Sequence, residues 1–198
     1  NYITLELGNP CHVFDHDKLA GGKLVVREAT PGEKVKTLYA GEHELRASDL
    51  VVADAERPQS LAGVIGGHDS QVDEHTTTVV FEMATWDTVS VRNTGRRLQI
   101  RTDAAFRFER GIDPRSIDFA AQRAVALICA VSGGQLAEGV LSEGAPLPED
   151  TAISLRPDRC DVMLGVKTDP QEMADLLNAL SFKTTIETDG TLSCVIPE

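Results

Sequence analysis

Short runs of β-branched and apolar residues, broken by glycine and proline, occupy the first hundred positions of this 198-residue chain. The runs cover residues 24–27, 35–38, 50–53 and 78–83. Gly-Gly, Pro-Gly and Arg-Pro pairs separate them, and runs of this length between turn formers are typical of β-strands. Strands so short must bury one face against another layer, which favours a sheet-rich body of two packed layers.

The periodicity changes in the next segment. Apolar residues recur at steps of three and four from Ile117 to Val131, which is the spacing of one face of an α-helix. Asp113 can cap the first turn, and Gly133 can end the helix in a left-handed conformation. The sequence therefore predicts a helix over residues 114–132.

A polar stretch with two prolines, residues 142–150, has the composition of a linker. Beyond it the pattern predicts a strand at 153–156, a helix near 169–180 and a hairpin over 184–196. The expected fold class is α+β, a layered and sheet-rich domain with packed helices over residues 1–145. A small truncated α/β unit follows over 151–198. The chain begins without methionine and its end reads as a strand cut short, so we expect a piece of a larger protein.

Charge and cysteine content narrow the possible functions. With 31 acidic and 19 basic residues, the formal charge of −12 argues against a general nucleic-acid coat. Six arginines from Arg92 to Arg110 against Asp103 and Glu109 nevertheless give a local charge of +4. This arginine island indicates either an anion-binding patch or ion pairs with nearby carboxylates.

Four widely spaced cysteines disfavour a disulfide scaffold or a zinc ribbon and favour a reducing, cytoplasmic location. No apolar run approaches the roughly 20 residues of a membrane helix, so no membrane partner is expected.

One carboxylate and one pair of histidines stand out as candidates for chemistry. Glu82 interrupts an apolar run, and a carboxylate buried there is costly unless it is paired or binds a ligand donor. The alternative is that its strand face meets solvent. His12 and His16 have the spacing of a metal-binding pair on a helical turn, or are simply loop histidines.

Two further segments each allow two interpretations. Residues 61–67 are glycine-rich but lack the Lys-Ser/Thr of a phosphate loop, so they form either a pocket wall or a tight turn. Residues 102–111 combine a hydroxyl, carboxylates and arginines with small alanines, which favours either a tight pocket or an internal Arg–Glu network.

Four sequence strings occur in a fixed order: Asn1-Tyr2 with Glu6 to Asp15, Leu61 to Gly67, Phe81 to Ala84, and Thr102 to Pro114. Together they resemble the β subunit of bacterial phenylalanyl-tRNA synthetase. The resemblance covers about residues 1–145, as the editing module called B3/B4. Residues from about 151 resemble the start of the next module, B5.

The resemblance implies hydrolysis of tyrosine wrongly esterified to tRNA(Phe), in support of aminoacylation by the whole ligase. An apolar pocket for phenylalanine cannot strongly reject an analogue that only adds a hydroxyl, so a second site must check the product. Two other functions stay open: a non-catalytic tRNA-docking or subunit-scaffolding module, and a metal hydrolase built on His12 and His16.

The resemblance also implies the site residues. They are catalytic His12 and Thr102 and substrate-binding Gly63, Gly66, Glu82 and Ala104, with no metal. Glu82 would receive the tyrosyl hydroxyl, Ala104 would limit the pocket, and His12 would lie near the terminal adenosine of the tRNA.

The expected partners are tRNA(Phe) and the α subunit of a heterotetramer. No cofactor is expected in this fragment, whereas ATP and magnesium are expected for the whole enzyme.

Overall fold

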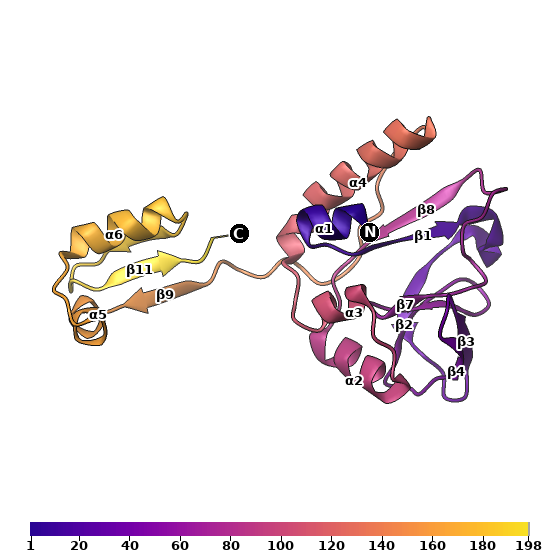
Figure 1. Ribbon diagram of the computed structural model, residues 1–198, viewed down its shortest axis with the longest axis horizontal. Coiled ribbons are helices and arrows are strands. Elements are labelled where there is room, and N and C mark those ends of the chain that lie inside the picture. The colour runs from indigo at the N-terminus through magenta and orange to yellow at the C-terminus, as the bar shows by residue number, and fades with distance from the viewer. Residues whose placement is uncertain (198) are drawn as a thin grey trace. The chain divides into compact units, whose positions relative to one another are not determined.

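The computed structural model describes residues 1–197 and divides into two compact units, Asn1–Val140 and a second that begins at Leu141 (Figure 1). The chain has a mixed α+β fold with several antiparallel sheets, as its sequence predicts. No helix within residues 1–197 is long and apolar enough to cross a membrane.

The first unit holds three antiparallel sheets in the described part of the chain. One has the order β2-β5-β6-β7, and the other two are the pairs β1-β8 and β3-β4. The bounds are β1 (Cys11–Asp15), β2 (Val25–Glu28), β3 (Lys34–Thr37), β4 (Gly41–Glu44), β5 (Leu50–Ala53), β6 (Pro58–Leu61), β7 (Ile65–Gly66) and β8 (Val79–Met83). The four predicted strand segments all contain observed strands.

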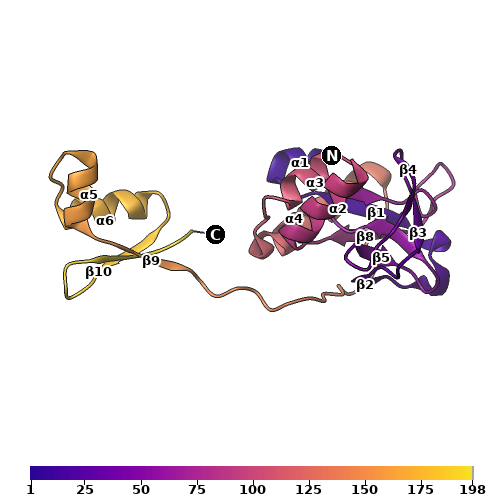
Figure 2. The same ribbon diagram turned by 90° about the horizontal axis from the view of Figure 1, so that it is seen from below.

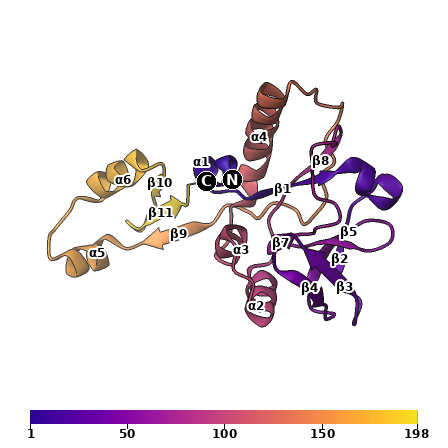
Figure 3. The same ribbon diagram turned by 45° about the vertical axis from the view of Figure 1, so that its right-hand side comes forward.

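The predicted long helix is confirmed. A 3₁₀ turn, η3 (Pro114–Ser116), leads into α4 (Ile117–Ser132), and Gly133 ends the helix with a φ of 70°. Helix α4 packs against β8 and against α1 (Tyr2–Leu7), beside which it lies in Figure 3.

Besides the short α1, two helices of the first unit were not expected from the sequence, α2 (Thr88–Leu98) and α3 (Asp103–Phe108). They contact each other and lie together in Figures 1 and 3. Val91 of α2 and Phe108 of α3 join the same apolar core as Val51 of β5 and Leu61 of β6. The burial of these side chains stabilises both helices against the four-stranded sheet.

A smaller core lies next to the first, around Phe14, Val52 and Ala62. Trp86, the only tryptophan of the chain, packs against both cores. It therefore joins the β1-β8 pair to the main sheet.

The second unit contains a sheet of order β10-β11-β9. Its elements are β9 (Ala152–Leu155), α5 (Pro157–Leu164), α6 (Pro170–Ala179), β10 (Lys183–Ile186) and β11 (Leu192–Val195). Helix α6 packs on β10 and β11, as Figure 2 shows, and buries Met173 against Leu192 and Cys194. The predicted strand, helix and hairpin are all present, and α5 is an additional helix.

Candidate functional site

The site begins with the pairing of β1 and β8. These strands are antiparallel, and His12 lies directly opposite Glu82. Opposite residues of an antiparallel pair project from the same face of the sheet, about 5 Å apart at Cβ. The pairing therefore brings two titratable side chains together from positions seventy residues apart.

His12 and Glu82 line a cavity of about 70 Å³ between the β1-β8 pair, the 60–66 segment and α3. Five of the six residues predicted for the site line this cavity: His12, Gly63, Gly66, Glu82 and Ala104. The structure thus joins residues from four separate sequence segments in one small cavity, and most of its lining residues are of apolar type.

Glu82 is a partly exposed residue, but its Oε2 atom is fully buried and has no hydrogen-bond partner among residues 1–197. Burial raises the pKa of Glu82 from 4.5 to about 7. A carboxyl oxygen held in an apolar site without a donor carries a desolvation cost that a ligand hydroxyl can relieve. The Oε2 end of Glu82 is therefore not in solvent, although the residue as a whole is partly exposed.

His12 presents a similar unsatisfied atom. Its Nε2 is buried without a partner, and its ring stands edge-on to that of Phe14, with the centroids 4.5 Å apart. Burial lowers the pKa of His12 from 6.5 to about 4, so the imidazole is neutral at pH 7. A neutral imidazole can exchange hydrogen bonds with water or with a ribose hydroxyl.

Both predicted glycines line the cavity, Gly63 in a turn and Gly66 in strand β7. Gly63 has a φ of 67°, and a Cβ built there would lie 2.6 Å from Cδ1 of Trp86. At Gly66 a Cβ would overlap the imidazole of His12. The rings of Trp86 and His12 thus occupy the space that side chains at these positions would need.

Thr102 stands beside the cavity and is not one of the residues that line it. Its hydroxyl donates to the carbonyl of Val64 at 2.6 Å and accepts from the amide of Ala105 at 2.9 Å. Thr102 is therefore the N-cap of α3 and ties that helix to the glycine loop. Through α3 it positions Ala104 at the cavity.

Other lining residues were not predicted for the site, among them Cys11, Ser60, Trp86 and Phe108. Trp86 carries a signal in retrospect, since it lies four positions after Glu82 and continues the even-numbered side of that strand. Cys11 adjoins His12, and burial raises the pKa of its thiol. Ser60 has no local signal, because only the pairing of β6 with β7 brings it here. Phe108 belongs to the possible pocket segment 102–111, and the packing of α3 places it at the cavity.

Both interpretations of the arginine island, ion pairing with carboxylates and an anion-binding patch, apply to part of it. Arg97 makes an ion pair with buried Asp49, and Arg110 pairs with Glu109 at 2.6 Å. In contrast, Arg96 and Arg101 are exposed and form no ion pair within residues 1–197. Some of the island is therefore internal pairing. The half-buried Arg92 and Arg107 also form no ion pair within residues 1–197, and the two exposed unpaired arginines are free to meet an anion.

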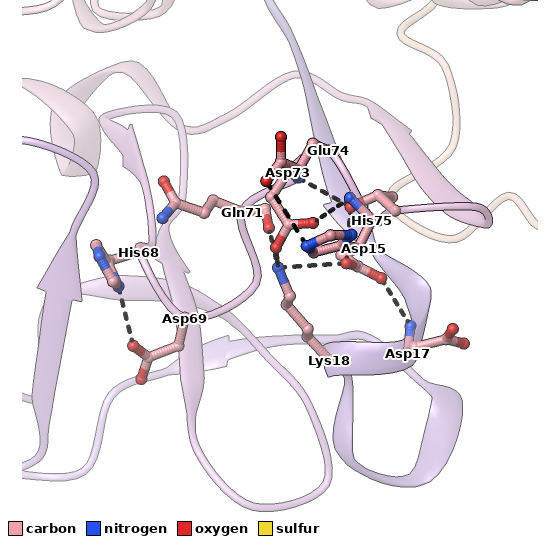
Figure 4. Close-up of polar contacts among 10 residues, drawn as sticks. Asp15, Asp17, Lys18, His68, Asp69, Gln71, Asp73, Glu74 and His75 are labelled. Atoms are coloured by element: carbon pink, nitrogen blue, oxygen red, sulfur yellow. Dashed lines mark hydrogen bonds and ion pairs between the residues drawn. The ribbon is translucent and has the colours of Figure 1, made fainter.

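A cluster of polar contacts at the end of β1 is shown in Figure 4. Lys18 Nζ lies 2.6 Å from Asp73 and 3.3 Å from Asp15, and it donates to the carbonyl of Gln71 at 2.8 Å. Asp15 also accepts a hydrogen bond of 2.8 Å from Thr76. These contacts hold the loop before β8 against β1, and so fix the strand that carries the catalytic-site candidates.

The metal interpretation finds no ligand set here. His12 lies in β1 and His16 in the 3₁₀ turn η1 (His16–Lys18), so they do not share a helical turn. Among residues 1–197 no three histidine, cysteine or carboxylate side chains come together as metal ligands.

Comparison with known proteins gives consistent matches. A sequence model of the B3/4 domain family matches residues 1–133. The chain is 40% identical over 197 residues to a phenylalanine–tRNA ligase beta subunit of Moorella thermoacetica, covering 100% of this chain and 24% of the relative. It is 42% identical over 189 residues to the corresponding subunit of Carboxydothermus hydrogenoformans, covering 94% of this chain and 23% of the relative.

The chain thus spans about a quarter of the length of these relatives. An N-terminal fragment of a phenylalanyl-tRNA synthetase beta subunit from Pyrococcus horikoshii also matches in structure. It has a TM-score of 0.47 at 16% identity and covers 99% of this chain and 57% of that one, a similarity too low to transfer detail.

Proposed function

The chain belongs to the B3/4 domain family, and from this premise we propose that it hydrolyses tyrosine wrongly esterified to tRNA(Phe). In this proposal residues 1–145 carry the hydrolysis and residues 151–198 begin the following module. The observation that carries the proposal is the buried, unpartnered Oε2 of Glu82 in an apolar cavity.

The discrimination rests on one oxygen atom. A tyrosyl hydroxyl that enters the cavity can donate to Glu82, and a donor to a carboxylate makes a strong, charge-assisted hydrogen bond. A phenylalanyl ring has no such donor and would leave the carboxyl desolvated. The loss of such a bond to a buried charged group costs about 2 kcal/mol, or roughly thirtyfold in selectivity.

Hydrolysis needs a water molecule directed at the ester carbonyl. The neutral His12, with its free Nε2, is suited to hold this water or the adjacent ribose hydroxyl. Backbone amides bordering the cavity would stabilise the charge on the carbonyl oxygen. Thr102 acts as a positioning residue, since its hydroxyl is used to cap α3 and to hold Val64.

Aminoacylation belongs, in this proposal, to the complete ligase. The complete ligase uses ATP, magnesium and its α subunit outside this chain. The tRNA links the aminoacylation site to the hydrolytic site. The wide spacing of the four cysteines favours the reducing cytoplasm in which tRNA is charged.

The test compares tyrosyl- and phenylalanyl-tRNA(Phe) as substrates of the complete ligase and its Glu82→Ala variant. We expect the variant to lose most of its preference for the tyrosyl ester. The matched control is Glu56→Ala, because Glu56 is an exposed glutamate of the same unit outside the cavity. Unchanged selectivity in Glu82→Ala would refute the assigned role.

A second candidate function is tRNA docking without hydrolysis, which the exposed Arg96 and Arg101 favour. If docking is the function, the double variant Arg96→Gln/Arg101→Gln should weaken tRNA binding and flatten its salt dependence. Hydrolysis of a small tyrosyl ester would then be absent in the parent chain as well. Detectable hydrolysis by the parent would favour the first candidate.

A further inference from the structure

A second cleft, of about 180 Å³, lies where the β3-β4 hairpin meets the start of β6. It is separate from the cavity of Glu82 and shares no lining residue with it. Its walls are strongly polar, and three cations, Lys34, Lys36 and Arg57, line it.

Two of these cations are neutralised within the cleft. Lys34 lies 3.0 Å from Glu42, and Arg57 lies 3.0 Å from Asp69. Lys36 forms no ion pair or side-chain hydrogen bond within the described residues 1–197 and is exposed. The three lining cations and two lining carboxylates therefore leave one uncompensated positive charge, and that charge is on Lys36.

One lining residue of the cleft, Gln59, also carries an unsatisfied acceptor. Gln59 is 1% exposed, and its Nε2 donates to Asp54 at 2.6 Å. Because the carboxylate can only accept, this bond fixes the orientation of the amide and leaves Oε1 without a partner. A ligand that offers both a negative charge and a donor group would complement Lys36 and Gln59 together.

The cleft and the Glu82 cavity adjoin along one strand ladder. Pro58 and Gln59 of β6 line the cleft, whereas Ser60 and Leu61 of the same strand line the cavity. The opposite strand repeats this order, since Gly66 lines the cavity and its neighbour Gly67 lines the cleft. Consecutive residues of β6 therefore line the two sites, which makes them neighbours along this strand.

We propose that the cleft binds a phosphate group of a ribonucleotide, with Lys36 facing the phosphate and Gln59 accepting from a ribose hydroxyl. In the context of the proposed function, on which this part rests, the ligand is a backbone phosphate close to the RNA 3′ end. The shared chemistry is a phosphate ester, and its source is either an RNA strand or a free phosphorylated molecule.

The experiment measures binding of the full chain to a single-stranded RNA oligonucleotide and, separately, to inorganic phosphate, across a salt series. The variants are Lys36→Gln and the charge-conserving Lys36→Arg. Lys23→Gln is the matched control, because Lys23 is an exposed lysine of the same unit away from the cleft. Lys36 is a surface residue without partners, so the folded state should be retained in all three.

We expect Lys36→Gln to weaken RNA binding and to reduce the slope of log K against log salt by about 0.7, the value for one single-strand phosphate. The ratio of the parent's affinity to the variant's affinity should then fall by roughly 2.6-fold between 50 and 200 mM salt. Lys36→Arg and Lys23→Gln should keep the parent slope.

An unchanged slope in Lys36→Gln would overturn the proposal. Lys36-dependent binding of inorganic phosphate without RNA binding would overturn the RNA source and retain the phosphate site. None of these readouts requires ester hydrolysis, so a chain that binds RNA through Lys36 but fails to hydrolyse tyrosyl-tRNA refutes the proposed function alone.

Discussion

Two titratable groups of the cavity, Glu82 and His12, should act on stability in opposite directions. Glu82 has a folded pKa of about 7 against 4.5 when unfolded, so the unfolded chain loses this proton first as the pH rises. Its contribution to stability is complete below pH 4.5 and is lost between pH 4.5 and 7. His12 has a folded pKa of about 4 against 6.5, so its contribution is complete above pH 6.5 and is lost as the pH falls toward 4.

Each shift spans about 2.5 pH units, which corresponds to about 3 kcal/mol in the free energy of unfolding. Between pH 4.5 and 6.5 the two slopes, each about 1.4 kcal/mol per pH unit, have opposite signs and cancel. The joint contribution of Glu82 and His12 to the stability of the parent should therefore be constant between pH 4.5 and 6.5. In Glu82→Gln only the slope of His12 remains, so the stability of this variant should rise with pH relative to that of the parent. In His12→Gln only the slope of Glu82 remains, so the stability should fall with pH relative to that of the parent.

Urea unfolding of the full chain at half-unit steps from pH 4 to 8 measures these profiles, and Glu56→Gln controls for the loss of a surface carboxyl. All other titrating groups are common to the variants, so differences from the parent isolate the two residues. If the stability difference between Glu82→Gln and the parent varies by less than about 1 kcal/mol from pH 4 to 8, the carboxyl is solvated and the argument for the site is wrong.

Three further predictions follow from the packing. Gly66→Ala should displace the His12 ring, which should lower the stability in urea unfolding by about 1–3 kcal/mol and reduce ester hydrolysis. A variant with the stability and the hydrolysis of the parent would contradict this close contact. Thr102→Val should cost about 1–2 kcal/mol through loss of the cap of α3, whereas Thr102→Ser should melt near the parent temperature. Arg97→Gln should cost about 3 kcal/mol because it leaves Asp49 buried without its cation, and an effect no larger than that of an exposed arginine of the same helix would argue against this pair.

Local patterns predicted the elements whose residues repeat with one period. Helix α4 follows from the recurrence of apolar residues and from the glycine at its end, and β5 from its compact apolar run. Helix α2 could not be predicted in this way. It contains several β-branched residues and Gly95, all poor helix formers. Its stability comes from burying Val91, Thr94 and Gly95 against the core, a contribution made by distant residues.

The candidate site, like the fold, could be predicted from the sequence only in part. Residue type and strand alternation identified Glu82 as unusual, and the resemblance to a known family grouped it with His12, Gly63, Gly66 and Ala104. The alternation of side chains predicts which residues share a face of a strand, but it does not predict what covers that face.

Whether Glu82 meets water or an apolar chamber was decided by the pairing of β1 with β8 and by the packing of Trp86 and α3 over it. Sequence periodicity reflects the geometry of a few successive residues. Burial, and with it the pKa of a carboxyl, depends on chain segments brought together only when the whole unit folds.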